Sequence, residues 1–232
     1  MEIHGFQKTT LLDYPGHLAA TVFLGRCNFC CPFCHNSSLV LAPEKVETIP
    51  AEEVLATLKK RSGMLEGVCI TGGEPTLNPN LRDFIGRIRD LGLAVKLDSN
   101  GYKPEVLETL LKEKMLDYVA MDVKGAKDHY QEICGVRNLD ISRIEASVNI
   151  ISEMAPDYEF RTTYVKGLHT EEDVRGIGEW LAGDSTYYIQ NYKEGPEVIS
   201  PVFEGFSEEE IRGFKDILLK TLPNTHIRGD YE

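Results

Sequence analysis

The chain has 232 residues, 42% of them hydrophobic, and carries 37 acidic against 25 basic side chains, a formal net charge of −12. This length suffices for one domain with its own core, and the acidic balance excludes the concentrated basic surface that nucleic-acid binding needs. No apolar run approaches the roughly 20 residues of a membrane helix, and the opening MEIHGFQKTT lacks a secretory h-region. We therefore expect a single domain over residues 1–232 that is cytoplasmic, with no nucleic-acid or membrane partner.

Apolar runs typical of strands alternate along the chain with patterns typical of helices. The predicted strands are Leu18–Leu24, Val68–Thr71, Ala94–Ser99, Tyr118–Lys124, Glu159–Val165 and Tyr187–Tyr192. The predicted helices begin at Ala51, Pro79, Pro104, Ile141 and Glu171, and a last one follows a capping box of Ser207 and Glu210. Six β-α units indicate an α/β fold. They form either an open doubly wound sheet or a barrel, and they fall short of the eight units of a closed barrel.

Four unusual segments follow four successive predicted strands. The stretch CNFCCPFCHN comes after the first strand, TGGEP after the second, DSNG ends the third and MDVKG ends the fourth. In open parallel sheets and in barrels alike, ligands gather at the carboxyl ends of the strands. The sequence therefore predicts that the four segments build one site.

The first of these segments holds four of the six cysteines. Composition excludes a disulfide framework, which is typical of small secreted domains without a core; clustered thiols in a reducing compartment usually indicate metal or redox chemistry. Cys27, Cys31 and Cys34 form C-x3-C-x2-C with Cys30 as a bystander, or the four form two abutting C-x-x-C pairs. Structural zinc normally uses two knuckles separated by a loop, so the abutting pairs make zinc the weaker alternative.

The C-x3-C-x2-C pattern, with the aromatic Phe33 before its last cysteine, resembles the signature of the radical S-adenosylmethionine (SAM) enzymes. The resemblance continues through GGEP at Gly72–Pro75 and covers essentially the whole chain. FQKTTLLDYPG at Phe6–Gly16, followed by VFLGRCNFCCPFCHN, is similar to the activating proteins of anaerobic ribonucleoside-triphosphate reductase. The resemblance implies a partial (β/α)6 barrel of the radical SAM type, open laterally.

The family resemblance also implies the cofactors and the reaction. Three cysteines, Cys27, Cys31 and Cys34, would ligate one [4Fe–4S] cluster and leave one iron open for SAM. An electron from a low-potential donor would cleave SAM into methionine and a 5′-deoxyadenosyl radical, which would create a glycyl radical on the reductase. No cysteine-rich insert follows the motif, and Cys69 and Cys134 are expected to be packing residues, so a single cluster is predicted.

The predicted SAM contacts lie in the strand-end segments. Gly72 and Gly73 lack a Cβ and would let the backbone approach a ligand, and Glu74 offers a carboxylate to the SAM ammonium. Asp122 and Lys124 alternate along a strand and so point to one face. Taken alone, GG and SNG are commonly turns, and Arg161 fits a salt bridge at the rim equally well. The full predicted set is Phe33, Gly72, Gly73, Glu74, Pro75, Ser99, Asn100, Asp122, Lys124 and Arg161.

Three other functions remain open at this point. A radical SAM enzyme of this kind could act on another glycyl-radical enzyme, or on a small molecule such as a deazapurine precursor. A zinc-binding interaction module without catalytic activity is the third possibility.

Overall fold

The computed structural model describes residues 1–229 and is built on one curved sheet whose strands follow one another in chain order. Strands β2 to β8 are parallel, whereas β1 is antiparallel to β2. Within the described residues the edge strands β1 and β8 do not pair with each other, so the predicted lateral opening is confirmed. The strands are β1 (Ile3–Thr10), β2 (Ala19–Leu24), β3 (Gly67–Gly72), β4 (Ala94–Ser99), β5 (Tyr118–Asp122), β6 (Tyr158–Tyr164), β7 (Tyr187–Asn191) and β8 (Thr225–Arg228).

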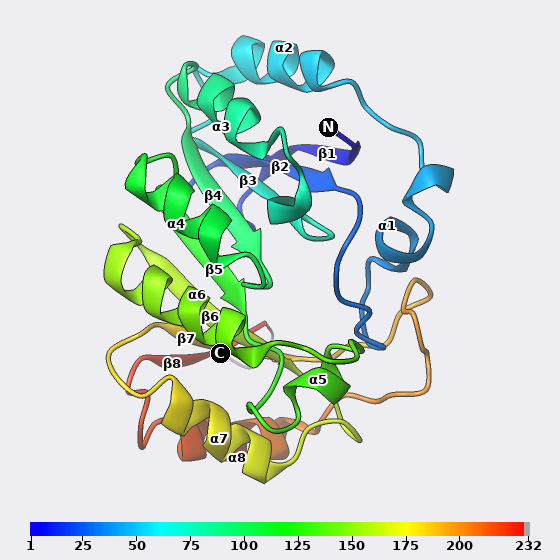
Figure 1. Cartoon of the computed structure of the whole chain (residues 1–232), viewed down its shortest axis with the longest axis vertical. Helices are drawn as coiled ribbons and strands as arrows, with labels where there is room; N and C mark the ends of the chain where they lie inside the picture. Colours follow the sequence, from blue (N-terminus) through cyan, green and yellow to red (C-terminus); the bar gives the residue numbers. More distant parts are fainter. Residues whose placement is uncertain (230–232) are drawn as a thin grey trace.

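The long helices cover the outer, convex side of the sheet, and the loops that follow the strands lie on the other side (Figure 1). The long helices are α2 (Ala51–Arg61), α3 (Leu81–Arg89), α4 (Pro104–Lys112), α6 (Ile141–Met154), α7 (Glu171–Trp180) and α8 (Glu208–Leu218). The short ones are α1 (Ser37–Leu41), η1 (Pro43–Lys45), η2 (Pro75–Leu77) and α5 (Tyr130–Ile133). No helix in residues 1–229 combines the length and the apolar character needed to cross a membrane.

The six predicted strands are β2 to β7, each with its boundaries within two residues of the prediction. The capping box of α8 is also confirmed, since Ser207 Oγ accepts from Glu210 N and the Glu210 carboxylate accepts from Ser207 N at 2.7 Å. Strands β1 and β8 were not predicted. β1 has three consecutive exposed residues where a half-buried strand would alternate, and β8 is only four residues long.

The two faces of the sheet differ in chemistry because alternate strand residues point to opposite sides. On β4, Val95 and Leu97 are fully buried in the same hydrophobic core as Ile85 of α3. The intervening residues Lys96 and Asp98 form an ion pair on the concave side, and Asp98 lines the cavity there. The sheet thus has an apolar face under the helices and a charged face that points inward.

Candidate cluster and cofactor site

A cavity of about 220 Å³ lies at the carboxyl ends of the central strands. The residues of the four predicted segments meet there, so the prediction of one site is consistent with the structure. Pro75 is buried at the start of η2 and Cys30 is exposed, and neither lines the cavity. The predicted residues that do line it are Cys27, Cys31, Phe33, Cys34, Gly72, Gly73, Glu74, Ser99, Asn100, Asp122, Lys124 and Arg161.

The cysteine loop, residues 25–36, follows β2 and presents three of its four thiols to the cavity. Cys31 is buried, and Cys27 and Cys34 are half-buried. Burial raises the pKa of the Cys27 and Cys31 thiols to about 12, and Lys124 opposes that rise. Such thiols become thiolates only where further positive charge stabilises them. Within residues 1–229 no three His, Cys, Asp or Glu side chains are gathered tightly enough to hold one metal ion.

A segment far along the chain lies across the cysteine loop. This strap, residues 192–205, follows β7, and its backbone donates two hydrogen bonds to the loop. Ile199 N donates to Cys34 O at 3.2 Å and Ser200 N donates to Pro32 O at 2.8 Å. The loop therefore takes part of its support from a segment more than 150 residues away.

The two glycines of TGGEP are required by the backbone structure, for a reason that the sequence did not reveal. Gly72 adopts a φ of +115°, which favours glycine, and a Cβ on Gly73 would lie 2.0 Å from Arg26 O. Gly73 N donates to Leu24 O at 2.8 Å and Glu74 N donates to Arg26 O at 2.7 Å. The close approach at Gly73 is therefore to the protein's own cysteine loop, whose start this segment holds in place.

Glu74 is 1% exposed, and its carboxylate accepts four hydrogen bonds. The donors are Thr76 N at 3.1 Å, Thr76 Oγ1 at 2.5 Å, Ser99 Oγ at 2.9 Å and Asn100 N at 2.6 Å. Burial raises the pKa of this carboxyl group and the four donors oppose the rise. Glu74 thus ties the end of β3 to the end of β4, and a contact with the SAM ammonium stays a prediction.

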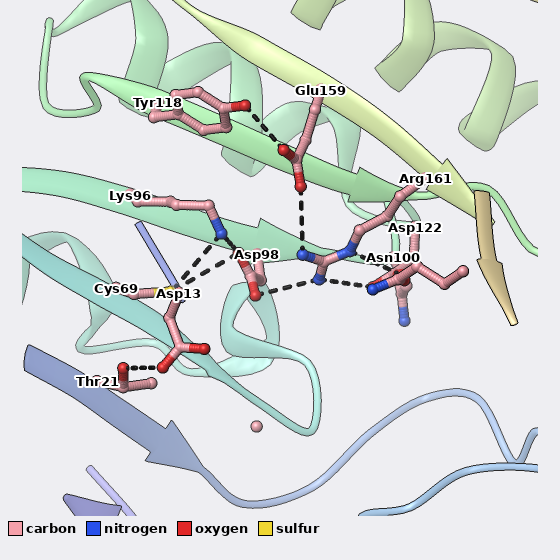
Figure 2. Close-up of polar contacts among 12 residues, drawn as sticks. Asp13, Thr21, Cys69, Lys96, Asp98, Asn100, Tyr118, Asp122, Glu159 and Arg161 are labelled. Atoms are coloured by element: carbon pink, nitrogen blue, oxygen red, sulfur yellow. Dashed lines mark hydrogen bonds and ion pairs between the residues drawn. The ribbon is translucent and has the colours of Figure 1, made fainter. Parts of the chain in front are cut away.

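Arg161 lies between two aspartates on the concave face of the sheet (Figure 2). Its guanidinium is 3.1 Å from Asp98 and 3.1 Å from Asp122, and Lys124 Nζ is 3.7 Å from Asp122. Burial opposes charge on Asp98, but Arg161 and Lys96 outweigh it and hold the pKa of that carboxyl group well below its usual range. Arg161 is 12% exposed, so its ion pairs lie inside the fold and not at its rim.

The same network continues toward the edge strand β8. Glu159 is completely buried and accepts from Tyr118 Oη at 2.9 Å and from both terminal nitrogens of Arg228 at 2.9 and 2.8 Å. It also lies 3.5 Å from Arg161 (Figure 2). Glu159 therefore connects β8 to the arginine at the cavity.

Sequence reasoning missed Asp98 as a cavity residue and did not include His169 among the predicted site residues. Asp98 alternates with Lys96 along β4, which was the available signal. His169 accepts from Val165 N at 3.1 Å through Nδ1 and donates to Lys124 O at 2.8 Å through Nε2. Burial lowers the pKa of His169, which favours this neutral form, and its ring meets Phe33 edge-on at 6.3 Å. It joins two strand ends to the cysteine loop.

Comparison with known families identifies the family to which a chain with this site belongs. The profile described as the radical SAM superfamily matches residues 21–181, which contain the cysteine loop, the glycine segment and the charged strands. The chain belongs to the radical SAM superfamily. Family membership implies a [4Fe–4S] cluster and SAM as cofactors, and it makes the zinc module the less favoured alternative.

Individual relatives of this radical SAM protein cover it to different extents. A protein of Methanocaldococcus jannaschii, named provisionally as a glycyl-radical enzyme activating enzyme, is 32% identical over 97% of this chain and 95% of its own length. A protein of Sulfurisphaera tokodaii, named provisionally as a GTP 3′,8-cyclase, is 34% identical over only 49% of this chain and 36% of its own. The crystal structure of Streptococcus suis SuiB bound to S-adenosylmethionine has a TM-score of 0.69 at 17% identity, and the match covers 90% of this chain and 52% of that one.

The residues present fit the implied cofactors. Three thiols share one cavity wall, the fourth cysteine lies outside it, and a buried amide nitrogen in the same loop, Asn28 Nδ2, has no acceptor within residues 1–229. Cys27, Cys31 and Cys34 would hold the cluster. The charged end of the cavity, with Lys124, is suited to the amino and carboxylate groups of SAM.

Proposed function

We propose that this radical SAM protein is a glycyl-radical enzyme activase whose substrate is a glycine of anaerobic ribonucleoside-triphosphate reductase. The observation that carries the proposal is the likeness of nearly its whole length to the M. jannaschii relative, whose name gives that class of activity. The GTP 3′,8-cyclase relative supports the small-molecule alternative less well, because that match stops at half of the chain.

When bound, the cluster and SAM would supply the chemistry, a one-electron reductive cleavage of SAM that yields a carbon radical able to take an α-hydrogen from glycine. The protein's own residues position these cofactors and shield them. Three cysteines hold the cluster, and Lys124 and Arg161, each already paired with Asp122, offer positive charge for the SAM carboxylate. The electron would come from a low-potential donor in the cytoplasm.

A protein substrate is supported by the open sheet. Because β1 and β8 do not pair in the described part of the chain, the sheet is not closed into a barrel, and an extended glycine-containing loop would reach the strand ends through this open side. A closed barrel would exclude such a loop. The inward-facing charged network partly fills the concave side, which favours a substrate that stays near the mouth of the cavity.

The choice of the reductase rests on the likeness of FQKTTLLDYPG, which has a structural role here. The segment forms β1 and the turn before β2, at the end of the sheet where β2 starts, opposite the cysteine loop. Tyr14 is 2% exposed and packs against Tyr118, and Asp13 accepts from Thr21 Oγ1 at 2.5 Å. This segment therefore supports the assignment through sequence likeness, and none of its residues lines the cavity.

The test uses anaerobically reconstituted, reduced protein with SAM and the reductase from the same cell. Electron paramagnetic resonance (EPR) should show the doublet of a glycyl radical, and oxygen should then cut the reductase at that glycine. Cys31→Ala, which removes a predicted ligand, is the inactive control. A doublet only on another glycyl-radical enzyme would correct the target. If no such enzyme acquires a radical while a deazapurine precursor stimulates SAM cleavage, the activase proposal is wrong.

A further inference from the structure

A short relay of amide groups leads from β4 into the cysteine loop. Tyr102 N donates to Asn100 Oδ1 at 3.0 Å, and Asn100 Nδ2 donates to Asn28 Oδ1 at 2.9 Å. A backbone N–H can only donate, so it fixes which end of the Asn100 amide is oxygen, and Asn100 in turn fixes Asn28. The amide nitrogen of Asn28 is thereby the end of the relay and is directed away from Asn100.

That terminal donor has no acceptor within residues 1–229, although it is buried. A buried donor without a partner costs about 1–3 kcal/mol, and native proteins rarely leave one. Four buried side-chain nitrogen or oxygen atoms in the described residues are unpartnered in this way, and only the one on Asn28 belongs to the cysteine loop. The loop therefore carries a fixed donor that fits an acceptor other than the protein.

The neighbours of Asn28 indicate what that acceptor is. Asn28 follows Cys27 directly, and Asn100 Nδ2 lies 3.8 Å from Cys27 Sγ. Phe29 N donates to the same sulfur at 3.4 Å. Asn100 lines the cavity but Asn28 does not, so the buried Asn28 donor, one residue after Cys27, lies outside the open space available to SAM.

We propose that Asn28 and Asn100 form a donor pair that hydrogen-bonds the sulfur atoms at the Cys27 corner of the cluster and raises its reduction potential. The reduced cluster is the more negative form, so donors to its sulfur atoms stabilise it more than the oxidised form. Asn100 holds Asn28 in place, and Asn28 supplies the free N–H. The inference rests on the cluster of the proposed function but is independent of which enzyme is activated.

The experiment compares wild-type protein with Asn28→Leu, which keeps a similar volume and removes the donor, and with Asn28→Asp, which puts an acceptor in its place. Asn80→Ala is the control, because Asn80 is exposed and its side chain caps nothing in α3. Each protein is reconstituted anaerobically, assayed for iron and sulfide, and titrated under EPR without SAM and without the reductase.

In both Asn28 variants the ratio of reduced to oxidised cluster at a fixed applied potential should fall about tenfold, a midpoint about 59 mV more negative. The control should match wild type. An unchanged or raised midpoint with full iron would overturn the proposal, as would a shift that appears only after SAM is added, because the donor would then serve SAM.

If neither Asn28 variant assembles a cluster, wild-type protein labelled with 15N-asparagine is exchanged into D2O and its reduced form is examined by electron-nuclear double resonance. A deuteron of an asparagine amide coupled to the cluster supports the donor pair, and the absence of that coupling overturns it. Wild-type protein that assembles no cluster would refute the proposed function as well. A normal cluster without radical formation on the reductase would refute only the choice of target.

Discussion

Replacing Gly73 by alanine should damage the cysteine loop itself. The added Cβ would lie 2.0 Å from Arg26 O, against an ordinary contact of at least 3.4 Å, so the two backbone segments must separate by more than 1 Å. That separation breaks the hydrogen bonds from Gly73 N to Leu24 O and from Glu74 N to Arg26 O. At about 1 kcal/mol for each of the two bonds, with overpacking of about 1–3 kcal/mol, we expect the free energy of unfolding to fall by about 3–5 kcal/mol.

Urea unfolding of the cluster-free protein, followed by iron and sulfide analysis after reconstitution, measures both consequences. The matched control is Gly213→Ala in α8, whose Cβ meets no atom within 4 Å and which should raise stability by about 0.5–1 kcal/mol. We expect the Gly73 variant to lose stability and to bind less iron. A wild-type urea midpoint and full iron content, with only SAM cleavage reduced, would refute this reasoning and show that Gly73 serves the ligand.

Three further predictions follow from the site and its charged network. Cys30→Ala should keep about the full iron content and Cys27→Ala should lose the cluster, because only the second thiol lines the cavity; iron loss in the first variant would exclude the three-cysteine assignment. Glu159→Ala leaves two arginines without their shared carboxylate and should cost about 3–5 kcal/mol in urea unfolding, so a cost under about 1 kcal/mol would contradict the network. Burial disfavours charge on Asp98 and Asp122, yet their arginine and lysine partners lower the pKa of both carboxyl groups, so the folded state binds fewer protons than the unfolded state. The contribution of these two carboxylates to the free energy of unfolding is present above the ordinary carboxyl pKa of about 4 and is lost as pH falls below it. A urea midpoint that stays constant from pH 5 to pH 3 would contradict this direction of pH dependence.

The parts of the fold that were predicted from the sequence are those set by local pattern. The capping box of α8 needs only Ser207 and Glu210, three residues apart, and each strand from β2 to β7 shows its own apolar run. The three-cysteine register, which the family resemblance implies, stays a prediction, and three of the four clustered thiols line the cavity as that register requires. The unpredicted features depend on partners far along the chain: Asn28 meets Asn100 across 72 positions, and Arg228 meets Glu159 across 69. Short-range periodicity carries no signal for such pairs.

The distance along the chain between contacting residues also limited the roles that could be predicted for single residues. Gly73 was predicted to let the backbone approach a ligand, which stays a prediction; the close approach that the structure shows is to Arg26, which the sequence could not identify. Asp98 lines the cavity and lies 3.1 Å from Arg161 because β4 and β6 bring the two residues together. The sequence of one strand alone does not show that contact. The sequence motifs thus indicated where a site could lie, but the contacts between its residues become visible only in the folded sheet.

The strap across the cysteine loop has a consequence for biosynthesis. Cys34 and Pro32 receive backbone hydrogen bonds from Ile199 and Ser200, so a nascent chain that has emerged only as far as β7 carries all of its cysteines but lacks these two supports. Delivery of iron and sulfide to such a chain would meet an incompletely held loop. The loop therefore gains these two supports only after translation has passed the strap, and a cluster held by the loop would meet its fully supported form only from that point on.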